Sequence, residues 1–234
     1  MAQTAAGKVI TVFNQKGGAG KTTTACQLAG TFGHRGFDVL VADLDRQGSA
    51  SKWLARGSED GRFPATLWSG HLYSGNVAAE LGKMVGKYDL IFVDCAPAVD
   101  QPGTWSSLLV SDLAIIPTKL TPADIDAVYD SFELAKRARK EIGVDFPVRV
   151  LATAYRRNRS DERVALESLE ENTAYPEFPL LRTTLGDRVA FTRSMLYGVT
   201  AHSIPKAGDA VTELDALADE ISKILGIGSR KSKK

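Results

Sequence analysis

Residues 14–23 read Asn-Gln-Lys-Gly-Gly-Ala-Gly-Lys-Thr-Thr, and this stretch carries the strongest structural signal in the chain. A β-branched apolar run, 9–13, precedes it, and apolar residues at helical spacing follow it over 21–34. Glycines between a strand and a helix let backbone N–H groups approach an anion, because no Cβ stands in the way. The helix N-terminus adds free donors and the positive end of its dipole. The stretch therefore predicts a loop that binds phosphate groups.

The loop departs from the common phosphate-loop pattern G-x-x-x-x-G-K-[ST]. With Gly20, Lys21 and Thr22 in register, the first glycine of that pattern falls on Gln15, and an additional lysine, Lys16, follows it. We expect Lys21 to reach the β- and γ-phosphates and the Thr22 hydroxyl to bind Mg²⁺. The residues expected to bind the nucleotide in this loop are Gly17, Gly18, Ala19, Gly20, Lys21, Thr22 and Thr23.

Away from the loop, short apolar runs alternate with longer amphipathic stretches. The runs are apolar almost throughout, which is typical of strands buried on both faces. This alternation predicts an α/β fold with a single, mainly parallel β-sheet flanked by helices. Because the glycine-rich loop lies between the first strand and the first helix, the expected fold is the P-loop NTPase fold. The expected strands are 9–13, 39–42, 90–93, 113–116 and 148–152, and the expected helices are 21–34, 76–86, 122–142, 161–172 and 209–225. Residues 55–75 are interpreted as an irregular surface excursion.

Length and composition favour one soluble domain. The chain has 234 residues, 44% of them hydrophobic and 24% charged, with a net charge of +1. Neither a signal peptide nor an apolar stretch of membrane-spanning length is visible, and the two cysteines stand in apolar segments typical of reduced thiols. We therefore expect a cytoplasmic protein with an N-terminal extension at 1–8, one folded domain at 9–225 that contains the phosphate loop, and a basic flexible tail at 226–234.

Three aspartates follow predicted strands. Asp43 and Asp45 end the strand at 39–42, and Asp94 ends the apolar run at 90–93. Ligands bind at the carboxyl edge of open α/β sheets, so these side chains are expected beside the phosphate loop. An apolar strand that ends in aspartate is the Walker B form, which predicts that Asp94 binds Mg²⁺.

Together, these motifs resemble the deviant Walker A motif and its partner motifs in the ParA/MinD family of P-loop ATPases, closest to the short ParA-type partition ATPases. The resemblance implies that the domain at 9–225 is an ATPase domain and that Lys16 is the signature lysine, which reaches the nucleotide of the partner subunit in an ATP-dependent sandwich dimer. It assigns Asp45 to positioning the attacking water and Asp43 to the vicinity of the metal, within a segment similar to D-x-D-P-Q-G. Arg46 stands where the family has proline, which leaves this turn without a fixed φ.

The resemblance also implies roles for later segments. Pro117 and Thr118 end the strand at 113–116 and are expected to neighbour the nucleotide, although a proline at 122 also fits a plain helix start. Basic residues near the C-terminus contact non-specific DNA in the family, and the positions carried over are Arg188, Arg193 and Lys206. A second basic cluster at 156–163 is equally compatible with a solvated helix face.

The implied function is the ATP-dependent partition or positioning of plasmid DNA, chromosomal DNA or another large cargo, with ATP and Mg²⁺ as cofactors. The expected partners are a second copy of the chain, non-specific DNA and a ParB-type or small DNA-binding adaptor that stimulates hydrolysis. The protein would be nucleoid-associated when ATP is bound and would form no stable membrane association. Two alternatives remain: a MinD-like positioning ATPase that cycles on a membrane, and a metabolic P-loop synthetase or kinase.

Overall fold

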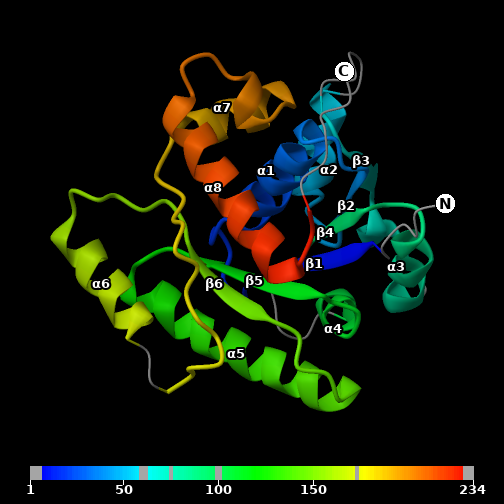
Figure 1. Ribbon diagram of the computed structural model, residues 1–234, viewed down its shortest axis with the longest axis horizontal. Helices are drawn as coiled ribbons and strands as arrows, with labels where there is room; N and C mark the ends of the chain where they lie inside the picture. The colour runs from blue at the N-terminus through cyan, green and yellow to red at the C-terminus, as the bar shows by residue number, and fades with distance from the viewer. Residues whose placement is uncertain (1–6, 58–62, 74–75, 98–101, 172–173, 229–234) are drawn as a thin grey trace.

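A six-stranded sheet runs through the middle of the molecule, and all of its neighbouring strands are parallel (Figure 1). The structure is a computed structural model that describes residues 7–57, 63–73, 76–97, 102–171 and 174–228. The strand order is β3-β2-β4-β1-β5-β6. The strands are β1 (Lys8–Val12), β2 (Val39–Asp43), β3 (Thr66–Trp68), β4 (Leu90–Asp94), β5 (Leu113–Thr118) and β6 (Val148–Ala152).

Helices cover both faces of this sheet, because alternate side chains of each buried strand point to opposite faces. Figure 1 shows α1 (Lys21–His34), α7 (Val189–Tyr197) and α8 (Gly208–Leu225) above the sheet and α5 (Pro122–Ile142) below it. One buried apolar cluster joins α1, α2 (Ser49–Gly57) and α8 to the sheet. A second joins α3 (Val77–Val85), α4 (Pro102–Leu108) and α5 to the other face. The remaining helix, α6 (Ser160–Glu170), packs with the ends of β6 and α5.

The predicted fold class is confirmed, and most expected elements are present. The helix predicted over 122–142 has those bounds, and the one predicted over 76–86 is capped by Asn76, whose side chain accepts from the Ala79 N–H. The prediction of an irregular excursion at 55–75 was incomplete, because the three-residue edge strand β3 and the short helix η2 (Gly70–Leu72) lie within it. The helices α2, α4 and α7 were not predicted.

The proposed division at the two ends of the domain stays a prediction. Of the expected extension, residues 1–6 lie outside the described part, whereas Gly7 donates its N–H to the Val85 carbonyl and Lys8 begins β1. Of the expected tail, 229–234 likewise lie outside the described residues.

The topology places the switch point of the sheet, where α/β folds form a ligand crevice, at the carboxyl ends of β1 and β4. The chain leaves β1 through α1 on one face and reaches β2, whereas it leaves β4 through α4 on the other face and reaches β5. Neighbouring strands whose connections depart in opposite directions open such a crevice, which is where ligands bind in α/β sheets. The glycine-rich loop follows β1 and Asp94 ends β4, so both sit at this point.

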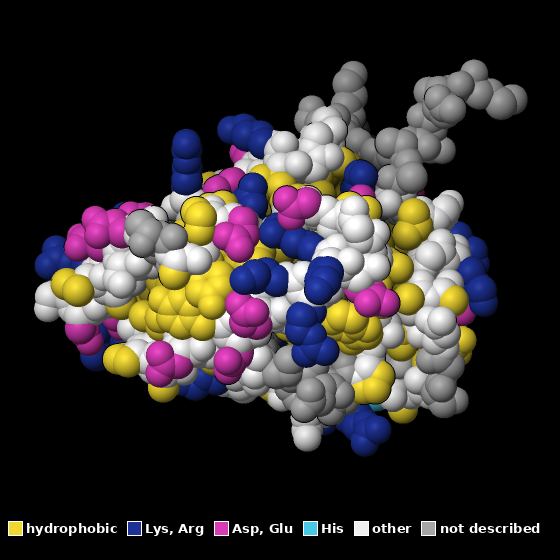
Figure 2. All heavy atoms as spheres, turned by 90° about the horizontal axis from the view of Figure 1, so that it is seen from below, with side chains coloured by type: hydrophobic (Ala, Val, Ile, Leu, Met, Phe, Trp, Pro, Cys, Tyr) yellow, Lys and Arg dark blue, Asp and Glu magenta, His cyan; other side chains and the backbone are white. Residues whose placement is uncertain are grey.

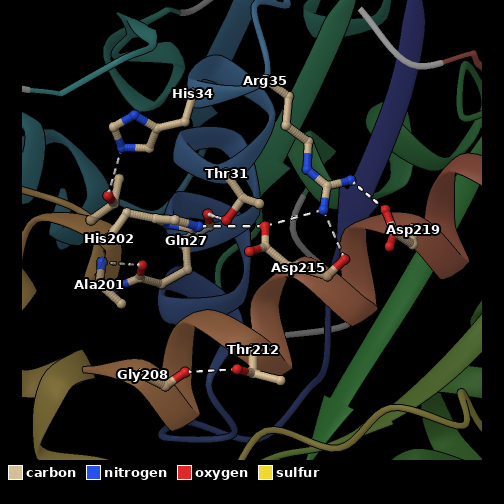
Figure 3. A network of polar contacts seen from close by, with 11 residues as sticks. Gln27, Thr31, His34, Arg35, Ala201, His202, Gly208, Thr212, Asp215 and Asp219 are labelled. Carbon is tan, nitrogen blue, oxygen red and sulfur yellow. Dashed lines mark hydrogen bonds and ion pairs between the residues drawn. The ribbon is translucent and has the colours of Figure 1, made fainter. Parts of the chain in front are cut away.

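Contacts along α1 anchor this first helix to the C-terminal part of the chain (Figure 3). The amide of Gln27 accepts from the Ala201 N–H (2.9 Å) and donates to the Ser194 hydroxyl (2.5 Å), and it is fully buried. At the end of α1, Arg35 donates to Asp219 on α8 (2.7 Å). Because α1 starts in the glycine-rich loop, these contacts fix the position of that loop relative to α7 and α8.

Candidate functional site

The glycine-rich loop has a backbone conformation that requires glycine. Gly18 and Gly20 have φ of 73° and 95°, in the left-handed region that other residues rarely adopt. Gly20 is also the N-cap of α1, and its carbonyl accepts from the Thr24 N–H (2.8 Å). A Cβ on Gly20 would lie 3.3 Å from the Thr153 hydroxyl, which itself holds the loop by donating to the Ala19 carbonyl (2.9 Å). The loop therefore lies against the residue that follows β6 as well as leading into α1.

Lys21 is folded onto its own loop. Its ammonium donates to the Lys16 carbonyl (2.9 Å), and the residue is 6% exposed. Burial lowers the pKa of Lys21, and the negative charges of Asp94 and Asp45 oppose that effect. A buried cation held by a single carbonyl is poised to exchange that carbonyl for a phosphate oxygen, which would pair its charge.

Asp94 is a buried carboxylate whose negative charge is poorly balanced by its surroundings. It lies opposite Asp43 in the register of β4 and β2, is fully buried, and neither carboxylate oxygen has a hydrogen-bond partner among the described residues. Burial raises its pKa to about 8; the neighbouring Thr22 hydroxyl lowers the pKa, the Asp43 charge raises it, and the Lys21 charge lowers it. A buried carboxylate without partners fits a divalent cation, which would supply the missing charge and favour ionisation.

The other two aspartates shape the turn after β2. Asp43 accepts from the Ser51 N–H (2.7 Å) at the start of α2 and from the Asp45 N–H (3.1 Å). The Asp45 carboxylate accepts from the Gln47 N–H (2.9 Å) and is partly exposed. Arg46 is exposed in this turn, so the backbone hydrogen bonds, rather than a proline ring, define its shape. Asp45 is thus the one of these two carboxylates that remains open to solvent.

Lys16 and the end of β5 lie next to each other. The Lys16 ammonium pairs with Asp124 on α5 (2.7 Å), and the Lys16 N–H donates to the Asn14 side chain (2.9 Å). The Asn14 amide in turn donates to the Pro117 carbonyl (2.8 Å). The hydroxyl of Thr118 faces the Asp124 carbonyl (3.3 Å). Pro117 and Thr118 are therefore brought to the loop, through Asn14 and Asp124, which the sequence patterns did not identify.

A cavity of about 180 Å³ opens beside the loop, on the side of β6. Gly18, Gly20 and Thr23 line it, and so does Thr24, whose buried hydroxyl has no partner among the described residues. The sequence predicted neither this cavity nor its remaining lining. That lining comes from distant segments, namely Lys119, Thr153, Ala154, Leu185, Gly186, Asp187, Arg188, Phe191 and Thr192.

The three basic residues expected at DNA have different surroundings. Arg188 lines the cavity and pairs with Glu213 (2.6 Å) and Asp209 (3.0 Å), so carboxylates neutralise its charge. Arg193 and Lys206 are exposed, and Arg193 borders a groove that includes Tyr197. By contrast, the face seen in Figure 2 mixes Lys and Arg with Asp and Glu, so it presents no field of a single sign.

Neither of the two free cysteines is placed for thiol chemistry. Both thiols are buried, and burial raises the pKa of Cys95 to about 12, which keeps it unreactive. No group of three or more His, Cys, Asp or Glu side chains in the described ranges is placed to hold a metal without further ligands. In the same ranges, no helix is both long and apolar enough to cross a bilayer.

The comparisons with known proteins agree with this geometry. The chain is 29% identical over 219 residues to maintenance of carboxysome distribution protein A of Halothiobacillus neapolitanus, covering 92% of this chain and 94% of that protein. The Cyanothece McdA(D38A)–ATP complex has the same fold, with a TM-score of 0.76, 15% identity and coverage of 96% and 98%. A plasmid partition protein of Borrelia burgdorferi bound to AMPPNP has a TM-score of 0.72, 21% identity and coverage of 93% and 99%.

A family model described as the CobQ/CobB/MinD/ParA nucleotide binding domain matches residues 10–201, from β1 to the short helix η3 (Ala201–Ser203). The match includes the glycine-rich loop and all three aspartates of the crevice. The resemblance expected from the motifs is confirmed: the chain belongs to the CobQ/CobB/MinD/ParA family of nucleotide-binding domains.

Proposed function

We propose that the protein is an ATPase that partitions or positions a large cargo, such as plasmid or chromosomal DNA, through an ATP-dependent dimer. The observation that carries this proposal is the meeting of three groups at one crevice. These are a glycine loop in the left-handed conformation, the buried ammonium of Lys21 and the unpartnered carboxylate of Asp94. Phosphate oxygens and a divalent cation would satisfy both side chains at once.

In this proposal the loop residues 17–23 bind the phosphates, and Lys21 leaves the Lys16 carbonyl to contact them. Thr22 and Asp94 would hold Mg²⁺, and Asp43 fixes the turn after β2 through its hydrogen bonds. The ion supplies positive charge where the phosphates are most negative. The remainder of the nucleotide occupies the cavity next to Gly18 and Gly20.

Hydrolysis needs a water in line with the terminal phosphate, and Asp45 is assigned to orient it. Its carboxylate is partly exposed and belongs to a turn that directly follows β2, so it can turn toward the phosphates without unfolding an element. Lys16 is assigned to the nucleotide of the second subunit. A cation delivered from a partner subunit stabilises transition-state charge as an arginine finger does, which makes activity depend on assembly.

The proposal includes non-specific DNA as the surface on which the dimer moves and an adaptor on the cargo as the stimulator of hydrolysis. It draws on the similarity to partition proteins and to the carboxysome distribution protein, and on the exposed cations Arg193 and Lys206. The net charge is only +1, so contact would depend on local patches doubled by dimerisation. The protein would then be nucleoid-associated in its ATP form and free in the cytoplasm otherwise.

A Lys21→Ala variant tests the nucleotide site. Equilibrium binding of ATP with Mg²⁺, followed by phosphate release, should show loss of binding or of turnover, because the loop loses its only buried cation among the described residues 14–23. Lys140→Ala is the matched control, since Lys140 is an exposed lysine in the last turn of α5. If Lys21→Ala binds and hydrolyses ATP as the parent does, the proposal is wrong.

A further inference from the structure

Lys16 is held at three points in the nucleotide-free chain. Its N–H donates to Asn14 (2.9 Å), its carbonyl accepts from the Lys21 ammonium (2.9 Å), and its own ammonium pairs with Asp124 (2.7 Å). Its side chain is 35% exposed, whereas the carboxylate that holds it is 6% exposed. The lysine assigned to a partner subunit is therefore tied back onto its own chain.

Asp124 is built into the start of α5. It is the third residue of this 21-residue helix, and the hydroxyl of Thr121, the N-cap residue, donates to its second carboxylate oxygen (2.5 Å). Burial raises the pKa of Asp124, but the hydrogen bonds from Lys16 and Thr121 and the charges of Lys16 and Lys119 outweigh it, so the pKa is lowered. Both carboxylate oxygens are thus engaged, and the group is held ionised.

The position of Lys16 is unfavourable without this carboxylate. A helix N-terminus carries the positive end of the helix dipole, which repels a cation. The exposed Lys119 adds a second positive charge that acts on the same carboxylate. Asp124 is consequently the group that keeps the Lys16 ammonium at this helix end.

We propose that Asp124 is a positioning residue that holds Lys16 back in the nucleotide-free monomer, and that ATP-driven assembly proceeds only after this ion pair breaks. The inference rests on the proposed trans role of Lys16. It adds a barrier within the chain that opposes premature pairing of two subunits. Nucleotide binding removes another contact that holds Lys16 in place, because Lys21 must leave the Lys16 carbonyl to reach a phosphate.

Labelling of lysine amines in the nucleotide-free protein tests the restraint directly. The protein is treated briefly with an amine-reactive ester, and the modification of Lys16 is measured by peptide mass spectrometry relative to the exposed Lys140. Asp124→Asn should raise the relative labelling rate of Lys16 by about threefold to fivefold, the upper part of the range expected for losing one partly exposed ion pair. Asp124→Glu, which restores the charge, should return the rate to within about twofold of the parent.

The chain offers a matched control in Glu162→Gln. Glu162 is the third residue of α6, is as buried as Asp124, and pairs with Arg156 (2.5 Å). Neutralising it should perturb a helix start to a similar degree but leave the labelling of Lys16 unchanged. Equal increases in Asp124→Asn and Glu162→Gln would mean general loosening of helix starts, which would overturn the inference.

Light scattering during an ATP titration then measures assembly. Asp124→Asn should form dimers at an ATP concentration about threefold to tenfold lower than the parent, with monomer affinity for ATP unchanged. Faster labelling of Lys16 without a lower threshold would show that the ion pair exists but does not oppose assembly, and the inference would be wrong. A parent chain that binds ATP and never dimerises would instead contradict the proposed function, whatever the labelling shows.

Discussion

Replacing Asp94 by asparagine should make the nucleotide-free protein more stable, although it removes a residue assigned to the metal. Asp94 is fully buried with no hydrogen-bond partner among the described residues, and burial raises its pKa from 3.8 to about 8. Between about pH 4 and about pH 8 the folded chain therefore holds a proton that the unfolded chain has released. The free energy of unfolding contributed by this group falls as the pH rises through that window and levels off above it.

The magnitude follows from about 1.4 kcal/mol for each pH unit. At pH 7, about three pH units above the ordinary pKa of Asp94, the burial of this carboxyl costs about 4 kcal/mol. A buried asparagine amide without partners costs about 1–3 kcal/mol, which is about what the equally unpartnered protonated carboxyl costs, so these two costs cancel. Asp94→Asn should therefore be more stable than the parent by about 4 kcal/mol at pH 7, and the advantage should vanish near pH 4.

Urea unfolding at pH 5, 6, 7 and 8, without nucleotide or metal, measures this difference. Asp130→Asn, at an exposed aspartate within α5, is the control for the substitution itself. The addition of ATP with Mg²⁺ should then reverse the ranking, because only the parent gains stability from the ligand. An Asp94→Asn chain that is less stable than the parent at pH 8, or whose advantage is the same at every pH, would refute the reasoning.

Three further outcomes are expected. Lys16→Ala should retain ATP binding but lose ATP-dependent dimerisation in light scattering, because Lys21 remains in the loop; a normal dimer would contradict the trans role. Asp45→Ala should bind ATP and accumulate as the dimer while phosphate release falls at least about tenfold; release at the parent rate would show that another group orients the water. Arg193→Glu should weaken filter binding to all duplexes alike and reduce the log–log salt slope of the dimer by about 2, since two phosphate contacts are lost; Lys140→Glu is the control, and an unchanged slope would place the DNA elsewhere.

The local parts of the site could be predicted because each depends on a short stretch of chain. Gly18 and Gly20 adopt a conformation that glycine alone adopts without cost, so their spacing before Lys21 already implied the loop. The apolar runs of β1, β4 and β5 implied buried parallel strands, and the strand-end position of Asp94 implied its place in the crevice. Short elements such as β3 gave no comparable signal, because three residues carry too little periodicity to distinguish a strand from a loop.

What the sequence determined by itself is therefore the class of chemistry: a phosphate loop with two lysines, and carboxylates at strand ends. Only the tertiary structure decided which distant groups complete it. Asp124 meets Lys16 because α5 starts where β5 ends next to β1, and Arg188 reaches the cavity because the chain returns along β6 after α6. Such contacts join residues about a hundred or more positions apart, so short sequence patterns cannot reveal them. They exist because each helix must bury its apolar side against one face of the sheet, which brings segments distant in the sequence to the same edge.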